Sequence, residues 1–134
     1  MAAEVVDDSL QSLIDYPQTF LATAGIDAPG SMQGVNQLPV WQGELESVRD
    51  HALVENRHNP TTVHLRTLIT ERYKVTVYRN ADYGELFDLE EDPQELHNRW
   101  DDPHYASIKA QMLLKFVQAE MERESTRMKR IIHA

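Results

Sequence analysis

Cysteine is absent from all 134 residues of this sequence. A disulfide framework, a thiolate metal site and a cysteine nucleophile are therefore excluded within the chain. Long apolar runs are absent as well, since none approaches the roughly 18 residues that a membrane-spanning helix needs. The first residues lack the basic and apolar regions of a signal peptide. We therefore expect no membrane association and a soluble, cytoplasmic chain as it stands, with its final compartment left open.

Positive charge is scarce. Thirteen lysines and arginines stand against 22 acidic residues, which gives a net charge of −9. This balance argues against nucleic-acid binding, which requires a basic face. Basic residues outnumber acidic ones only near the C-terminus, where we interpret them as the solvated side of a helix.

Local motifs for catalysis and metal binding are also missing. The sequence contains no glycine-rich phosphate loop and no Gly-x-Ser-x-Gly elbow. Its six histidines do not have the spacing of a helical metal site; they are His51, His58, His64, His97, His104 and His133. The acidic run at 88–92 lacks the pattern of a calcium loop, so we interpret it as a turn before Pro93, with Glu95 in a short helical turn. No catalytic and no metal-ligating residue is predicted.

The first third of the chain is expected to be helical and then irregular. Apolar residues recur at helical spacing over residues 8–24. Pro17 divides this pattern into two pieces, Asp15 can cap the second, and Gly25 can end it. Residues up to Gly43 are rich in glycine and proline, which predicts an irregular connection.

Residues 50–90 are expected to form strands. Strand-forming residues gather in four short stretches, at 52–55, 65–70, 73–78 and 85–89. The second and third are separated only by Glu71 and Arg72, which predicts a tight hairpin of unknown turn type. The result is an antiparallel meander of three or four strands, which needs a helix on one face to be stable.

The remaining residues supply that helix. Asp102 followed by Pro103 is a strong helix start. The predicted apolar face consists of Ala106, Ala110, Leu113, Leu114, Val117 and Met121, widened by Ile108, Met112 and Phe116. Pairs at i,i+3 link Glu120 to Arg123 and Glu124 to Arg127. The predicted fold is α+β: a small antiparallel sheet of three to four strands packed against a long C-terminal helix, with an N-terminal helix and an irregular connecting segment.

One polar segment stands out as a candidate binding site. Asn56, Arg57 and His58 follow a short predicted strand directly. Loops on a rigid sheet often carry ligand contacts, and an arginine beside a histidine suits an oxyanion such as sulfate or phosphate. We take these residues as candidates for substrate contact, with an ordinary solvated loop as the alternative.

Three motifs, in order, resemble the C-terminal end of a sulfatase of the alkaline-phosphatase superfamily. The first runs from Leu13 to Ile26, with Ala-Gly-Ile at its end and Gln33-Gly34 beyond it. The second is Leu65-Arg66-Thr67 leading to Arg72-Tyr73-Lys74-Val75. The third, and most specific, is Glu85-Leu86-Phe87-Asp88-Leu89 followed by Asp92-Pro93 and Asn98. The sequence departs from the usual pattern at three places: the position of Pro17, the residue Asn36, and the pair Arg99-Trp100 after Asn98.

The resemblance implies a non-catalytic part of a larger enzyme. Sulfatases use a formylglycine made from Cys or Ser in Cys/Ser-x-Pro-x-Arg, beside a divalent metal, with calcium expected; neither site has a counterpart here. Residues 1–49 would then be the edge of a catalytic domain, and residues 50–134 a C-terminal subdomain that completes the fold and walls the substrate pocket. The expected partner is the missing N-terminal catalytic domain, or a second copy bound through the N-terminal helix.

Other functions stay open. The chain could instead be a free-standing interaction or oligomerisation protein that reuses this fold, or, least expected, a small enzyme in its own right. The parent enzyme could be a sulfatase or a phosphonate or phosphate monoester hydrolase, because the C-terminal parts of these enzymes look alike.

Overall fold

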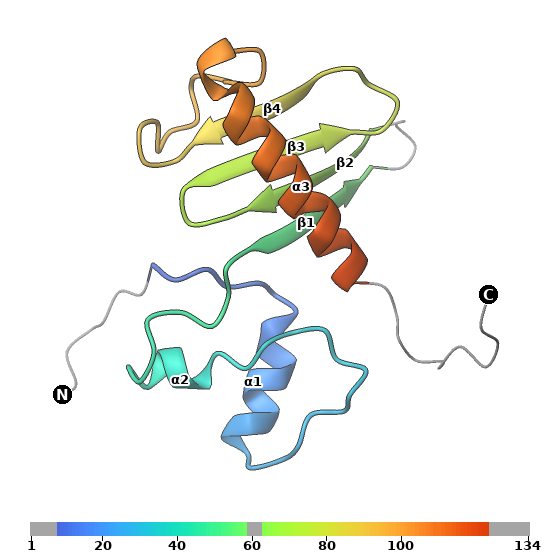
Figure 1. The fold of residues 1–134 in the computed structure, drawn as a ribbon. Helices are drawn as coiled ribbons and strands as arrows, with labels where there is room; N and C mark the ends of the chain where they lie inside the picture. The colour runs from blue at the N-terminus through green and yellow to red at the C-terminus, as the bar shows by residue number, and fades with distance from the viewer. Residues whose placement is uncertain (1–7, 59–62, 124–134) are drawn as a thin grey trace, which may run out of the picture.

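The computed structural model describes residues 8–58 and 63–123. An N-terminal segment, residues 8–49, carries two helices and lies beneath a four-stranded sheet that is crossed by a long helix (Figure 1). The elements are α1 (Asp15–Thr23), α2 (Leu38–Trp41), β1 (Ala52–Arg57), β2 (His64–Ile69), β3 (Tyr73–Tyr78), β4 (Gly84–Asp88), the short 3₁₀ helix η1 (Pro103–Tyr105) and α3 (Ala106–Glu122). Among the helices of these residues, none is long and apolar enough to cross a membrane.

The sheet is an antiparallel meander in the order β1-β2-β3-β4, which confirms the predicted fold class. Leu68 lies opposite Val75, and Val75 lies opposite Leu86, so three fully buried side chains form a row across the strands. Because side chains alternate along a strand, this row lies on one face of the sheet. Helix α3 crosses the same face (Figure 1).

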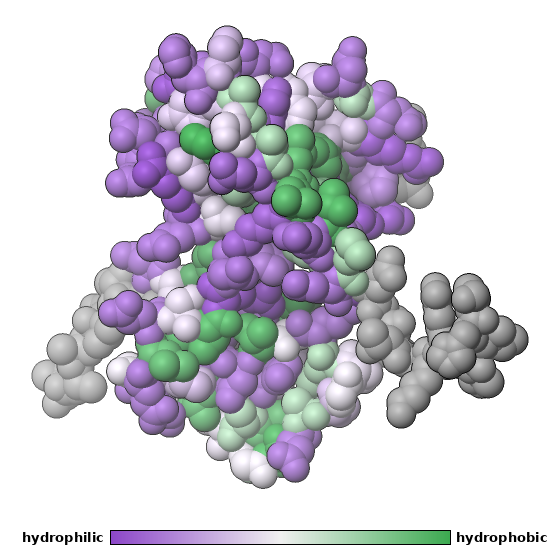
Figure 2. Space-filling model, in the orientation of Figure 1, coloured by the Kyte–Doolittle hydropathy of each residue, from purple (hydrophilic) through white to green (hydrophobic). Residues whose placement is uncertain are grey.

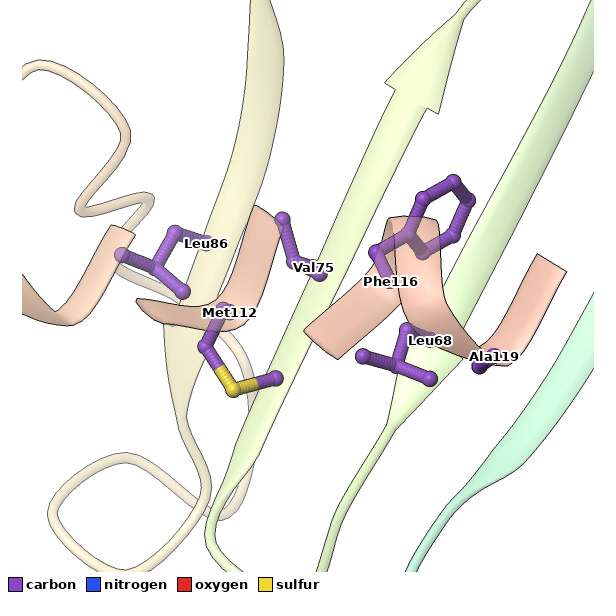
Figure 3. Close-up of a cluster of buried hydrophobic side chains, with 6 residues drawn as sticks. All are labelled: Leu68, Val75, Leu86, Met112, Phe116 and Ala119. Carbon is purple, nitrogen blue, oxygen red and sulfur yellow. The ribbon is translucent and has the colours of Figure 1, made fainter. Parts of the chain in front are cut away.

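The core is formed where α3 meets that row (Figure 3). Met112, Phe116 and Ala119 of the helix are buried against the sheet residues. The predicted apolar face of the helix was wrong in its centre, because Leu114, Val117 and Met121 are 61%, 55% and 65% exposed. Apolar residues of α3 occupy several sides of the helix. Only the stripe that faces the sheet is buried, namely Met112, Phe116 and Ala119, with spacings of four and three.

The turn predictions hold in part. Asp102 does cap, and its side chain accepts the backbone N–H of His104 at 2.9 Å, but it starts η1 rather than α3 itself. The Glu71–Arg72 hairpin is confirmed, with Thr70 and Tyr73 bonded through the backbone at 2.8 Å. Glu95 is not helical: it has φ of 56° and closes a turn from Asp92.

The N-terminal helix differs from its prediction in two ways. It is a single helix that begins at Asp15, with Pro17 in its first turn, where a missing N–H costs no hydrogen bond. Asp15 makes no cap; its carboxylate turns inward instead. Gly25 ends the helix as predicted, with φ of 68°. The segment expected to be irregular contains α2 as well.

Candidate functional site

The predicted site residues lie at the far end of β1. Asn56 and Arg57 belong to the strand, which corrects the prediction of a loop, because β1 pairs with β2 as far as Arg57 opposite His64. His58 follows, and its N–H donates to the carbonyl of Val63 at 3.2 Å. Side-chain alternation places Asn56 on the opposite face from Arg57, so the structure does not bring these two side chains together.

Arg57 is held by its neighbours. Its guanidinium forms an ion pair with the carboxylate of Glu55, and its Nε donates to Nε2 of His64 at 3.1 Å. The side chain is nevertheless 63% exposed. It is therefore fixed in place and open to a ligand.

Two further arginines approach the same carboxylate. Arg66 of β2 and Arg123, directly after α3, place Nη2 at 3.4 Å and 3.6 Å from Glu55. Burial alone would raise the pKa of Glu55, but the nearby arginines hold that pKa below its ordinary value. Arg66 also contacts Glu120 at 2.5 Å, and Arg123 contacts it at 3.2 Å. We call Arg57, Arg66 and Arg123 the arginine cluster.

The arginine cluster carries an excess of positive charge. Among the residues that the structure describes, its three guanidiniums face two carboxylates, those of Glu55 and Glu120, within a chain of net charge −9. Planar guanidiniums match the oxygens of sulfate, phosphate and carboxylate groups. The chemistry available here is anion binding, because the cluster holds neither a nucleophile nor a free base.

Sequence reasoning found part of this cluster. Arg57 was identified from its polar surroundings, whereas Arg66 and Arg123 were not. Strand alternation and the hairpin register could have placed Arg66 beside Glu55, since these two residues are opposite one another. Arg123 comes from the other end of the fold, and no local pattern indicates it.

No metal site is formed by the part of the chain that the structure describes. Within it, no group of three or more histidine or acidic side chains is placed to hold an ion. These residues therefore do not fit the divalent metal that the sulfatase resemblance implies.

A second set of polar residues lies where the N-terminal segment meets the sheet. Asp50 accepts a hydrogen bond from Nδ1 of His51 at 2.7 Å and pairs with Lys115 at 2.9 Å. The hydrogen bond from Lys115, followed by that from His51, lowers the pKa of Asp50. A hollow of about 340 Å³ opens beside His51.

Asp15 is the polar centre of the N-terminal segment. Its fully buried carboxylate receives Nε and Nη2 of Arg49 at 2.9 and 2.5 Å, the N–H of Val35 at 2.9 Å and Nε2 of Gln37 at 3.0 Å. Burial by itself would raise the pKa of Asp15, but these hydrogen bonds outweigh it and lower the pKa to about 2. One carboxylate thus joins α1 to the two chain segments that follow it.

The third sequence motif has a structural role. Asp88 is buried and binds Arg72 of the β2–β3 turn at 3.0 Å. Asn98 accepts the N–H of Leu86 at 2.9 Å and donates to the carbonyl of Gly84 at 3.0 Å, which covers the outer edge of β4. These residues close the sheet and are not placed as reacting groups.

Known proteins are similar in sequence to this chain. The chain is 31% identical over 119 residues to an uncharacterized protein of Haemophilus influenzae, covering 89% of this chain and 60% of the relative. It is 31% identical over 104 residues to a Δ4,5-hexuronate-2-O-sulfatase of Bacteroides thetaiotaomicron, covering 75% of this chain and 22% of that enzyme. The chain thus spans less than two thirds of these relatives.

Solved structures agree on the fold. A protein solved in complex with its substrate, D-glucosamine-2-N,6-O-disulfate, superposes with a TM-score of 0.73 at 22% identity, over 81% of this chain and 23% of its own. The model of the family described as N-sulphoglucosamine sulphohydrolase, C-terminal, matches residues 1–122. This chain therefore belongs to the sulphohydrolase C-terminal family and corresponds to the C-terminal part of sulfatases.

Proposed function

We propose that this chain is the non-catalytic C-terminal part of a sulfuric ester hydrolase, in which it completes the fold and walls one side of the substrate pocket. The family match over residues 1–122 carries the proposal. A catalytic portion would supply the formylglycine and the divalent metal, with calcium expected. The arginine cluster supports a role toward an anionic ester, because it presents excess positive charge on an acidic chain.

The N-terminal segment supports docking on a catalytic portion. Three of its buried residues are polar, namely Asp15, Thr19 and Gln37, and one, Val40, is apolar. Its large apolar side chains are outside: Leu13 is 81% and Phe20 62% exposed. Burial in soluble domains normally runs the other way. Exposed apolar side chains over a polar interior are expected of a segment whose outer surface is covered by another protein domain.

Three aromatic residues of α1 and α2 lie against one another. Tyr16, Phe20 and Trp41 pack ring against ring, with centroids 6.0 to 6.4 Å apart. Figure 2 shows apolar surface over these two helices. We call these three residues the aromatic face, and we propose that it docks on the catalytic portion of the enzyme.

The substrate role is tested in the intact hydrolase that contains this chain. Arg57→Ala and His58→Ala should each raise KM for a sulfate ester severalfold with little change in kcat, because they remove binding and not chemistry. Arg99→Ala is the control, since Arg99 lies beside β4 at the other edge of the sheet. Unchanged kinetics in both site variants would refute the assignment, and parallel assays with phosphonate and phosphate esters identify the ester class.

A further inference from the structure

His64 lies between two arginines at one end of the sheet. It is opposite Arg57 in the pairing of β1 with β2, and its carbonyl accepts the N–H of the exposed Arg79, directly after β3, at 2.8 Å. Residues opposite one another in antiparallel strands have their side chains on the same face. Arg57, His64 and Arg79 therefore form a row on one face of the sheet. Because alternate residues share a face, Arg66 of the arginine cluster lies on that face too.

The neutral ring of His64 supports Arg57. Nε of Arg57 donates to Nε2 of His64 at 3.1 Å, so this ring nitrogen acts as an acceptor and carries no proton. The same nitrogen lies 3.6 Å from a carboxylate oxygen of Glu55, which is an acceptor as well. In this state His64 orients Arg57 and adds no charge to the arginine cluster.

A proton on Nε2 would change both contacts. The new N–H would face the Nε–H of Arg57 at 3.1 Å, where two donors repel each other. It would instead pair with Glu55, whose oxygen is 3.6 Å away. A histidine ordinarily changes its charge between pH 5 and 8. Glu55 stays ionised over that range, because the arginines outweigh the effect of burial and hold the pKa of Glu55 below its ordinary value.

The charged groups around His64 come from every element packed near it. They are Glu55 and Arg57 on β1, Arg66 on β2, Arg79 after β3, and Glu120 and Arg123 at the end of α3. Four of these described groups are cations and two are anions. Uptake of a proton by His64 therefore raises an existing excess of positive charge, and it leaves Arg57 with one internal partner fewer. Both changes favour an external anion.

We propose that His64 is a further residue of the anion site and that the arginine cluster binds a sulfate group more tightly when His64 is protonated, an inference which rests on the role proposed above for this cluster. One added unit charge about 4 Å from an anion in water is worth about a fivefold change in affinity. Linkage is reciprocal, so a bound sulfate favours the protonated ring by the same factor.

Inorganic sulfate is the probe, because it stays a dianion throughout the range in which a histidine titrates. It is titrated into the 134-residue chain at constant ionic strength and followed by ¹H–¹⁵N NMR, including the Nε–H signal of Arg57. Binding should be about three- to tenfold tighter near pH 5.5 than near pH 8. Equal affinities at the two pH values would overturn the proposal.

Histidine variants assign the effect to one ring. His64→Gln keeps an acceptor for Arg57 but cannot take up a proton, so it should remove the pH dependence of sulfate binding. His104→Gln is the matched control, because His104 is exposed in η1, before the start of α3, whereas Arg123 follows the end of that helix. It should leave the pH dependence unchanged. A dependence that survives in His64→Gln and is lost in His58→Gln would overturn the assignment.

The titration of the His64 ring gives a second readout in the unaltered chain. Its carbon-bound ring protons, followed by NMR against pH, should titrate at higher pH when sulfate is present. A curve that sulfate does not move would overturn the proposal. Sulfate binding that is independent of pH but lost in Arg57→Ala would overturn the role of His64 alone. An absence of sulfate binding at every pH would also overturn the proposed role of the arginine cluster toward an anionic ester.

Discussion

At the scale of single residues, Gly34 lies so close to the backbone of Ile14 that a side chain has no room there. A Cβ built at this position would lie 2.0 Å from the backbone oxygen of Ile14, and backbone cannot move aside as a flexible side chain can. Gly34→Ala should therefore lower the free energy of unfolding by about 2 kcal/mol or more. Gly30→Ala is the control, because nothing lies within 4 Å of a Cβ there; it should be neutral or stabilise by up to about 1 kcal/mol. Urea unfolding measures both, and equal stabilities would contradict the close approach.

The lowered pKa of Asp15 makes the stability of the fold depend on pH in the acid range. Its pKa is about 2 in the folded chain and 3.8 as the ordinary value. A lowered pKa stabilises the fold above the ordinary pKa, so this contribution is lost as pH falls from about 4 to 2. Asp15→Asn should remove this part of the pH dependence of unfolding. If that variant does not fold, Arg49→Lys should move the acid transition to higher pH. An unchanged transition in the folded variant would contradict the role of Asp15.

At the scale of elements, substitutions in α3 test which side of this helix is packed in the core. Phe116 is 8% exposed against the sheet, while Leu114 on the same helix is 61% exposed. Phe116→Ala should cost about 3 to 5 kcal/mol of unfolding free energy, because it leaves a cavity. Leu114→Ala should change it by no more than about 0.5 kcal/mol. Denaturant unfolding measures both variants, and the result for Leu114 decides between the stripe found in the structure and the one predicted from periodicity, since Phe116 belongs to both.

Strands and helix ends were predictable for local reasons. The β2–β3 hairpin follows from runs of strand-forming residues, and Asp102-Pro103 marks a helix start by capping chemistry. The buried side of α3 was not predictable, because apolar residues occupy much of its circumference and only the sheet decides which are covered. The inward turn of Asp15 likewise depends on Arg49, 34 residues away.

The candidate site also contains residues that the sequence could identify and residues that only the fold brings together. Arg57 was identifiable from residue types in one segment, but Arg66 and Arg123 join it only through the hairpin and the path of α3. Asn56 belonged to the same predicted segment, yet strand alternation directs it to the other face. Whether Asn56, Arg57 and His58 contact a substrate stays a prediction, as does the domain division at residues 49 and 50.

At the scale of the whole molecule, the aromatic face predicts self-association when nothing else covers it. Phe20 is 62% exposed beside Tyr16 and Trp41, an apolar surface of the kind that drives association. Light scattering of the 134-residue chain should show a mass that rises with concentration. Phe20→Glu should abolish the rise, whereas Leu96→Glu, at a 70% exposed position on the other part, should not. A monomer at every concentration would contradict this prediction.

The proposed role of this chain is that of the C-terminal part of a sulfuric ester hydrolase. The most direct test is an immunoblot of the source cells with an antibody against this chain, followed by purification on the same antibody and an assay for sulfate-ester hydrolysis. We expect either a polypeptide several-fold larger than 15.5 kDa, or a 15.5 kDa chain bound to a separate catalytic protein, with activity in the purified material. A 15.5 kDa chain without a catalytic partner and without hydrolase activity would contradict the account and favour a free-standing interaction protein.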